Sequence, residues 1–222
     1  MRLLEPGAAM LAPSGSALPM RRGLWRAREP HRGGGRVLIV NGHPDPRPER
    51  FCAALCEACL AGARSAGRQA DMISPGALPS GDGQGSAHAS RDLARALDLV
   101  RGADHLTVIF PLWLDKPPLL LSKFFRQVAE AGTHDRGGGF IRRSVHFVVT
   151  MAMPAFAHRS ISRATRSTSP SQDLISLLGV ETDELSFIGS VDTISNAQRK
   201  EWLDRLHLLG LQGARSPRFR GH

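Results

Sequence analysis

The fold of this 222-residue chain is decided by the stretch Arg36-Val37-Leu38-Ile39-Val40-Asn41-Gly42-His43-Pro44-Asp45-Pro46-Arg47. Its apolar run is short, unbroken and rich in β-branched residues, which predicts a strand buried on both faces, as in a parallel sheet. A glycine and three prolines then end the strand in a polar loop, and a helical pattern begins at Phe51. Strand, loop and helix in this order form the first half of a βαβ unit. Ligands of open parallel sheets bind at such loops, so we expect a phosphate-bearing ligand near His43, Arg47, Arg50 and the first helical amides.

Charge divides the chain into a body and two basic tails. Residues 1–35 carry six arginines against two acids, a net +4, and residues 211–222 carry three arginines and no acid. The body, residues 36–210, therefore holds only +2 of the total charge of +9. We expect both tails to be disordered and solvated, and we expect no nucleic-acid partner. Because Met20 is another possible start, residues 1–35 are either a real extension or a wrongly assigned start.

The apolar content indicates a globular protein without an integral membrane segment. Hydrophobic residues make up 41% of the chain, and no apolar run approaches the roughly 20 residues of a membrane span. The use of cysteine fits a reducing compartment, so we expect a cytoplasmic protein.

Strands and helices alternate along the body. We expect strands at 37–40, 69–73, 106–110, 144–150 and 185–191, and helices at 51–66, 91–101, 119–131, 172–178 and 196–210, with Ser90 and Ser195 as N-caps. Such a pattern predicts a three-layer α/β/α sandwich, flavodoxin-like, with a parallel five-stranded sheet in the order 2-1-3-4-5. In this order the loops 42–50, 111–118 and 150–156 meet at one edge of the sheet.

These three loops lack the common nucleotide-binding and hydrolase motifs. No Gly-x-Gly-x-x-Gly follows the first strand, and P-loop and Gly-x-Ser-x-Gly motifs are absent from the sequence. The loops instead hold prolines, aromatic residues and cations. Arg47, Arg50 and the helix N-terminus suit a phosphate, while Trp113 and nearby backbone amides suit a flat ring. A flat ring with a phosphate tail suggests a flavin.

Several segments share their order and spacing with a known family. They are Val40-Asn41-Gly42-His43-Pro44 with the Arg-x-x-Arg-Phe-Cys-Ala-Ala-Leu that follows, Phe110-Pro111-Leu112-Trp113 with Pro118 and the helix at 120–125, Val148-Val149-Thr150-Met151, and Trp202-Leu203. Together they resemble the NAD(P)H quinone oxidoreductase family of flavodoxin-like proteins. The resemblance covers roughly residues 36–210.

This resemblance implies a flavin, FAD or FMN, that takes hydride from NAD(P)H and passes it to a quinone or similar acceptor. It also implies a homodimer with the active site at the subunit boundary. By position, the phosphate side of the flavin faces His43, Arg50, Phe51 and Cys52; the ring is held by Pro111, Leu112, Trp113 and Leu114, through main-chain amides and the indole; and its other side is closed by Thr150, Met151 and Ala152.

The chain departs from the family where hydride transfer is assisted. A family tyrosine near the nicotinamide falls at His158, a family histidine falls at Thr165, and the chain contains no tyrosine. We take His158 as the candidate catalytic residue, and expect flavin binding to survive with slower turnover. An alternative is therefore a catalytically weak flavodoxin-like regulatory subunit, of the kind that assists potassium efflux systems.

The three cysteines raise a third alternative. Cys52, Cys56 and Cys59 have the Cys-x-x-x-Cys-x-x-Cys spacing of a radical-SAM iron–sulfur site. Their surroundings favour a helix, on which these positions share the face that points to the core. Buried cysteine behaves as a small hydrophobe, so we expect these side chains in the core and no metal.

Overall fold

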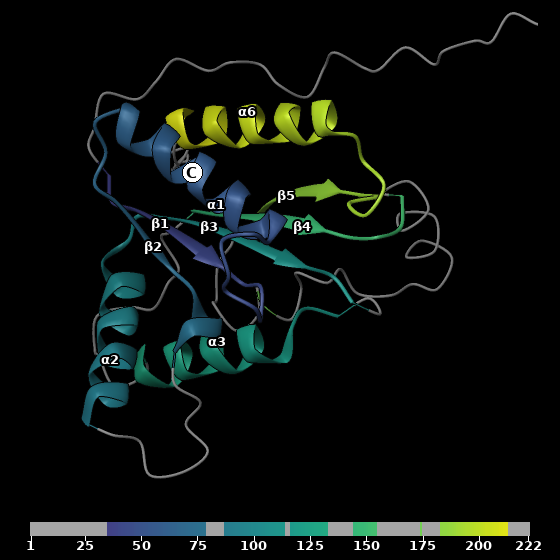
Figure 1. Ribbon diagram of the computed structural model, residues 1–222. Helices are drawn as coiled ribbons and strands as arrows, with labels where there is room; N and C mark the ends of the chain where they lie inside the picture. Colours follow the sequence, from purple (N-terminus) through teal and green to yellow (C-terminus); the bar gives the residue numbers. More distant parts are fainter. Residues whose placement is uncertain are drawn as a thin grey trace, which may run out of the picture.

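The computed structural model describes residues 35–78, 87–113, 116–132, 144–154, 174 and 183–212. Its centre is one parallel sheet in the order β2-β1-β3-β4-β5 (Figure 1). The predicted order is confirmed. The strands are β1 (Val37–Asn41), β2 (Ala70–Ile73), β3 (His105–Pro111), β4 (Ser144–Thr150) and β5 (Asp183–Ile188).

Helices cover both faces of this sheet, as the predicted three-layer sandwich requires (Figure 1). One face packs against α1 (Phe51–Ser65) and α6 (Asn196–Gln212), and the other against α2 (Ala87–Gly102) and α3 (Leu119–Gly132). A short 3₁₀ turn, η1 (Pro75–Ala77), follows β2. Alternate residues of each strand feed two hydrophobic clusters, one on each face. None of these described helices is long and apolar enough to cross a membrane.

Two predicted boundaries are wrong. The helix predicted to start after a Ser90 cap begins at Ala87, so Ser90 lies inside α2. The residues before Ser90 include Ala87 and Ala89, which favour a helix over the predicted loop. The strand predicted at 185–191 runs from Asp183 to Ile188, because Ser190 adopts a left-handed backbone conformation (φ 58°) that turns the chain. Of the helix predicted at 172–178, only Leu174 lies within the described residues, and it is helical and buried.

The predicted cap of the last helix is confirmed. Ser195 Oγ accepts a hydrogen bond from the Gln198 N–H (3.2 Å), and Gln198 Oε1 accepts one from the Ser195 N–H (2.8 Å). This reciprocal pair is a capping box. It fixes the start of α6 beside the carboxyl end of β5.

Helices α1 and α6 are in backbone contact. A Cβ atom on Gly62 would lie 2.0 Å from the His207 carbonyl oxygen, and one on Gly210 would lie 2.0 Å from the Cys59 carbonyl oxygen. No other residue type fits at either crossing point without displacing a helix. The two glycines therefore set how closely α6 presses on α1, whose N-terminus faces the predicted site.

Candidate functional site

The loops after β1, β3 and β4 leave the same edge of the sheet, as predicted (Figure 1). Main-chain hydrogen bonds extend the sheet into these loops: the Leu112 N–H donates to the Thr150 carbonyl (2.7 Å) and the Met151 N–H to the Ile188 carbonyl (2.9 Å). Gly42 passes close to β3 and α3, since a Cβ there would lie 2.8 Å from both Phe110 and Leu121 side chains. The backbone at this edge is therefore closely packed and hydrogen-bonded, which fixes the positions at which the loops begin.

The first loop is ordered by contacts between alternate residues. The buried Asn41 side chain accepts a hydrogen bond from the His43 N–H (3.2 Å). His43 Nδ1 lies 3.0 Å from the Asp45 nitrogen and 2.9 Å from the Asp45 carbonyl oxygen, and the tautomer decides which of them it contacts. Partial burial lowers the pKa of His43, which keeps the ring neutral at pH 7. The ring meets Trp113 edge to face, with 5.9 Å between centroids, and so joins the first loop to the second.

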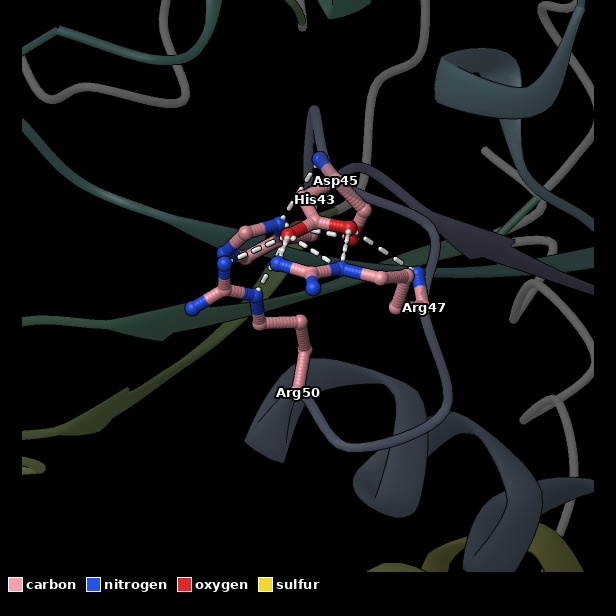
Figure 2. A network of polar contacts seen from close by, with 4 residues as sticks. All are labelled: His43, Asp45, Arg47 and Arg50. Carbon is pink, nitrogen blue, oxygen red and sulfur yellow. Dashed lines mark hydrogen bonds and ion pairs between the residues drawn. The ribbon is translucent and has the colours of Figure 1, made fainter.

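Asp45 lies between the two arginines that sequence analysis assigned to a phosphate (Figure 2). Its carboxylate accepts hydrogen bonds from Arg47 Nε (2.9 Å) and Nη2 (2.7 Å), from Arg50 Nε (2.7 Å), and from the Arg47 N–H (3.2 Å). The two guanidinium groups hold the pKa of Asp45 well below its usual range. This network was not predicted from the sequence, although an acid in the same loop as both arginines is a visible signal of it.

The N-terminus of α1 has free donors. Arg50 is its N-cap residue with an extended backbone, no side chain of the described residues caps the helix, and the first turn has no acid. The first main-chain bond of the helix runs from the Ala54 N–H to the Arg50 carbonyl (3.2 Å). Within the described part of the chain, nothing accepts a hydrogen bond from the amides of residues 51–53. These amides and the helix dipole suit an anion.

Cys52 and Thr150 lie beneath this edge rather than on its surface. Both are 3% exposed, and Cys52 Sγ lies 3.4 Å from Thr150 Oγ1. Their side chains tie the first turn of α1 to the end of β4. Both residues were predicted to contact the ligand, but their side chains point toward each other. A ligand at this edge would therefore contact their main chain and not their side chains.

The three cysteines occupy the hydrophobic cluster between the sheet and the pair α1 and α6. Burial raises the pKa of the Cys52 thiol to about 11 and that of Cys59 to about 12, and raises the pKa of Cys56 well above its usual value. Such thiols stay protonated and are poor metal ligands. The predicted helix and core placement of these residues are confirmed, and no cluster of three His, Cys, Asp or Glu suited to a metal ion occurs among the described residues.

In the second loop, which follows β3, the group available to a ligand is the Trp113 side chain and not the main-chain amides. Trp113 is 53% exposed, while Pro111 and Leu112 are buried. The Trp113 N–H donates to the Lys116 carbonyl (3.2 Å), the Lys116 N–H donates back (3.0 Å), and the Leu112 N–H is used by Thr150. Since Pro111 has no N–H, the predicted amide contacts to a ring are not supported at residues 111–113. The exposed indole is the group that remains.

The third loop combines a buried and an exposed part. Met151 is buried, whereas Ala152 is exposed and Met153 is 39% exposed. Leu114 and His158, which sequence analysis also assigned to the site, lie outside the described residues.

A fourth loop, residues 189–195, joins this edge and was not predicted to do so. The Ser190 N–H donates to the Met153 carbonyl (3.0 Å), and the Val191 N–H to the Met151 carbonyl (3.1 Å). Arg199 Nη2 donates to the Val191 carbonyl (2.7 Å), and the guanidinium lies 5.0 Å from the Phe51 ring centroid. The loop therefore supports the end of β4 and the first residue of α1, through contacts that no local sequence pattern signals.

Comparison with known families agrees with this arrangement. Residues 35–208 match the family model described as flavodoxin-like fold. The chain belongs to this family. No curated protein gave a match to this flavodoxin-like chain.

Solved structures share the flavodoxin-like fold at low sequence identity. An NAD(P)H:quinone oxidoreductase from Methanothermobacter marburgensis is 16% identical with a TM-score of 0.60, over 81% of this chain and 98% of that chain. An azoreductase from Bacillus anthracis is 16% identical with a TM-score of 0.55, over 80% of this chain and 99% of that chain. An FMN-dependent NADH-azoreductase from Bacillus anthracis, in complex with FMN, is 10% identical with a TM-score of 0.57, over 79% and 97%. At these identities the likeness shows the fold.

Proposed function

We propose that this flavodoxin-like chain is a flavin-dependent NAD(P)H oxidoreductase that reduces a quinone or similar acceptor. The observation that carries the proposal is a juxtaposition at one edge of the sheet. The α1 N-terminus has amides that find no acceptor among the described residues, and the exposed Trp113 lies on the neighbouring loop, joined to the first loop through His43. A phosphate tail and a flat ring are what these two features suit.

The residues of this edge divide the work of binding. The amides of residues 51–53 hold the phosphate, with Phe51 supported by Arg199. The Trp113 indole covers part of the ring, and the main chain at Thr150, Met151 and Ala152 borders its other side. When bound, the flavin supplies the hydride chemistry, and the protein positions it and excludes water.

FMN is the flavin favoured by the structural neighbours, because one of them binds it in a solved structure. FAD remains the competing flavin, and NADH and NADPH are both candidate donors. We place His158 near the nicotinamide, following the family resemblance, and we expect a homodimer in the cytoplasm.

The test is reconstitution of the purified chain with FMN or FAD. The visible spectrum is recorded anaerobically before and after addition of NADH or NADPH, followed by a quinone. Bands that bleach with the nucleotide and return with the quinone are the expected result. A protein that binds no flavin, or flavin bands that persist with both nucleotides, would overturn the proposal.

The oligomeric state is a separate measurement. Light scattering coupled to gel filtration, with and without FMN, measures the mass of the 24.0 kDa chain in solution. A mass of twice this value is expected, and a monomer at micromolar concentration would contradict the homodimer.

A further inference from the structure

The first loop of the proposed site carries no net charge. Residues 43–50 contain Arg47 and Arg50 and, in equal number, Asp45 and Glu49. The lowered pKa of His43 keeps its ring neutral. The loop therefore gives little Coulombic attraction to an anion, although it supplies two arginines.

Asp45 uses the donors that a phosphate would use. A guanidinium binds a phosphate or carboxylate best through two parallel N–H groups. On Arg47 such a pair, Nε and Nη2, already contacts Asp45, at 2.9 and 2.7 Å. On Arg50 the same two nitrogens contact it, with Nε at 2.7 Å. The Asp45 carboxylate thus occupies the Nε and Nη2 donors of both arginines.

The carboxylate is held in the loop from the inside. Its side chain is 25% exposed, against 67% for Arg47 and 45% for Arg50. The Asp45 main chain contacts His43 Nδ1, and Asp45 Oδ1 also accepts from the Arg47 N–H. These contacts hold the Asp45 main chain, so the carboxylate is positioned beside the two arginines before a ligand arrives.

We infer that Asp45 is a specificity-determining residue, an internal anion that competes with the phosphate group of the ligand for Arg47 and Arg50. The inference rests on the proposed flavin site and concerns how strongly that site prefers a flavin with a phosphate over one without. Phosphate recognition falls to the α1 amides, so the site favours FMN over phosphate-free riboflavin only modestly. Binding of FMN is accordingly weakly dependent on salt.

Asp45→Asn and Glu49→Gln form a matched pair of variants. Each removes one negative charge from the loop, but among the described residues Asp45 is the acid hydrogen-bonded to both arginines, whereas Glu49 acts on Arg47 through its charge alone. Dissociation constants for FMN and riboflavin are measured by flavin fluorescence quenching at about 25 and 250 mM salt. Circular dichroism verifies that each variant is folded.

Asp45→Asn is expected to raise the ratio of FMN affinity to riboflavin affinity by about tenfold at low salt, less at high salt. Glu49→Gln is expected to raise it by about twofold or less. Adding Arg50→Gln to Asp45→Asn is expected to reverse most of the gain. An unchanged or lower ratio in Asp45→Asn, or equal gains in the two single variants, would overturn the inference; a lower ratio would mean that Asp45 orients the arginines for the phosphate.

Inorganic phosphate separates this inference from the proposed function. Its binding is measured through the melting temperature of the wild type, Asp45→Asn and Glu49→Gln, without any flavin. A larger phosphate-induced rise in Asp45→Asn than in the other two supports the inference, and equal rises contradict it. If the wild type binds neither FMN nor FAD, the proposed function fails while the phosphate result still decides the role of Asp45.

Discussion

Trp113 is an exposed aromatic side chain with one fixed neighbour. Trp113 is 53% exposed, and among the described residues its ring makes an aromatic contact only with His43, whose ring lies nearly perpendicular to it at 5.9 Å between centroids. A large apolar side chain left in water at a ligand-binding edge gains most from a flat partner.

Trp113→Ala is therefore expected to weaken FMN binding by about fivefold to tenfold, with little change in stability. Leu208→Ala is the matched control, since Leu208 is also 53% exposed but lies near the far end of α6. Flavin titration and urea unfolding measure the two effects. Equal FMN affinity in the Trp113 variant and the control would remove Trp113 from the site.

His105 is a buried histidine at the opposite end of β3. Its Nδ1 lies 2.8 Å from Ser144 Oγ and its Nε2 lies 3.2 Å from Thr107 Oγ1, so both ring nitrogens have hydroxyl partners. Burial, above all, lowers its pKa to about 3. A neutral ring is therefore part of the folded state at any pH above about 3.

This lowered pKa makes stability depend on pH in one direction. Below the unfolded-state pKa of about 6.5, the unfolded chain takes up a proton that folded His105 refuses, so stability falls as the pH drops from about 6.5 towards 3. The slope from this one group approaches about 1.4 kcal/mol per pH unit. Urea unfolding at several pH values measures it, and His105→Gln is expected to flatten the curve by that amount. An equally steep curve in the variant would assign the acid sensitivity to other groups.

At the scale of elements, the crossing of α1 and α6 has no spare room. Gly62→Ala would place a methyl group 2.0 Å from the His207 carbonyl oxygen, which belongs to the backbone. The helices must separate, and we expect a loss of about 2–3 kcal/mol in unfolding free energy.

Gly102→Ala is the control for this substitution. The atoms nearest to a Cβ at Gly102 belong to the end of the Arg36 side chain, at 3.1 Å and beyond, and this flexible side chain can move aside. We expect stability to change by less than about 1 kcal/mol. Chemical denaturation compares the two variants, and similar losses in both would mean that the helix contact is looser than its geometry implies.

Sequence patterns predicted the elements well where burial alone dictates them. The runs Val37–Asn41, His105–Pro111 and Ser144–Thr150 are buried along nearly their whole length, and each reads as a parallel strand without further information. The start of α2 and the end of β5 were predicted wrongly, because residues 87–90 and Ser190 are decided by local backbone choices with little apolar pattern.

The candidate site was predicted only in part, for a different physical reason. Topology places its loops, so the positions of His43, Arg50 and Trp113 at one edge follow from the strand order. Ion pairs within a proline-rich loop follow no sequence periodicity. The sequence therefore could not show that Arg47 and Arg50 pair with Asp45 instead of pointing to a ligand. The approach of Arg199 to Phe51 joins residues 148 positions apart and depends on the packing of α6.

On the scale of the whole molecule, the proposed ligand would join parts of the chain that unfold together. Its contacts come from loops after three strands and from the start of α1. Binding to the folded state alone adds about 2.7 kcal/mol at a ligand concentration 100 times the dissociation constant. For a chain of this size the melting temperature is expected to rise by about 5–10 °C with FMN. Circular dichroism follows the transition, and an unchanged midpoint at that concentration would show that FMN does not select the folded state.

The placement of the cysteines gives the chain a built-in reporter of its own opening. All three cysteines of the protein lie on α1 and are buried between the sheet and the helices α1 and α6, with exposures of 3%, 0% and 0%. Iodoacetamide attacks thiolates that solvent can reach, so alkylation has to wait until this helix layer lifts from the sheet. The rate of labelling, followed by intact mass, therefore measures how often the helix layer of α1 and α6 separates from the sheet. No engineered probe is needed, and no thiol elsewhere in the chain interferes.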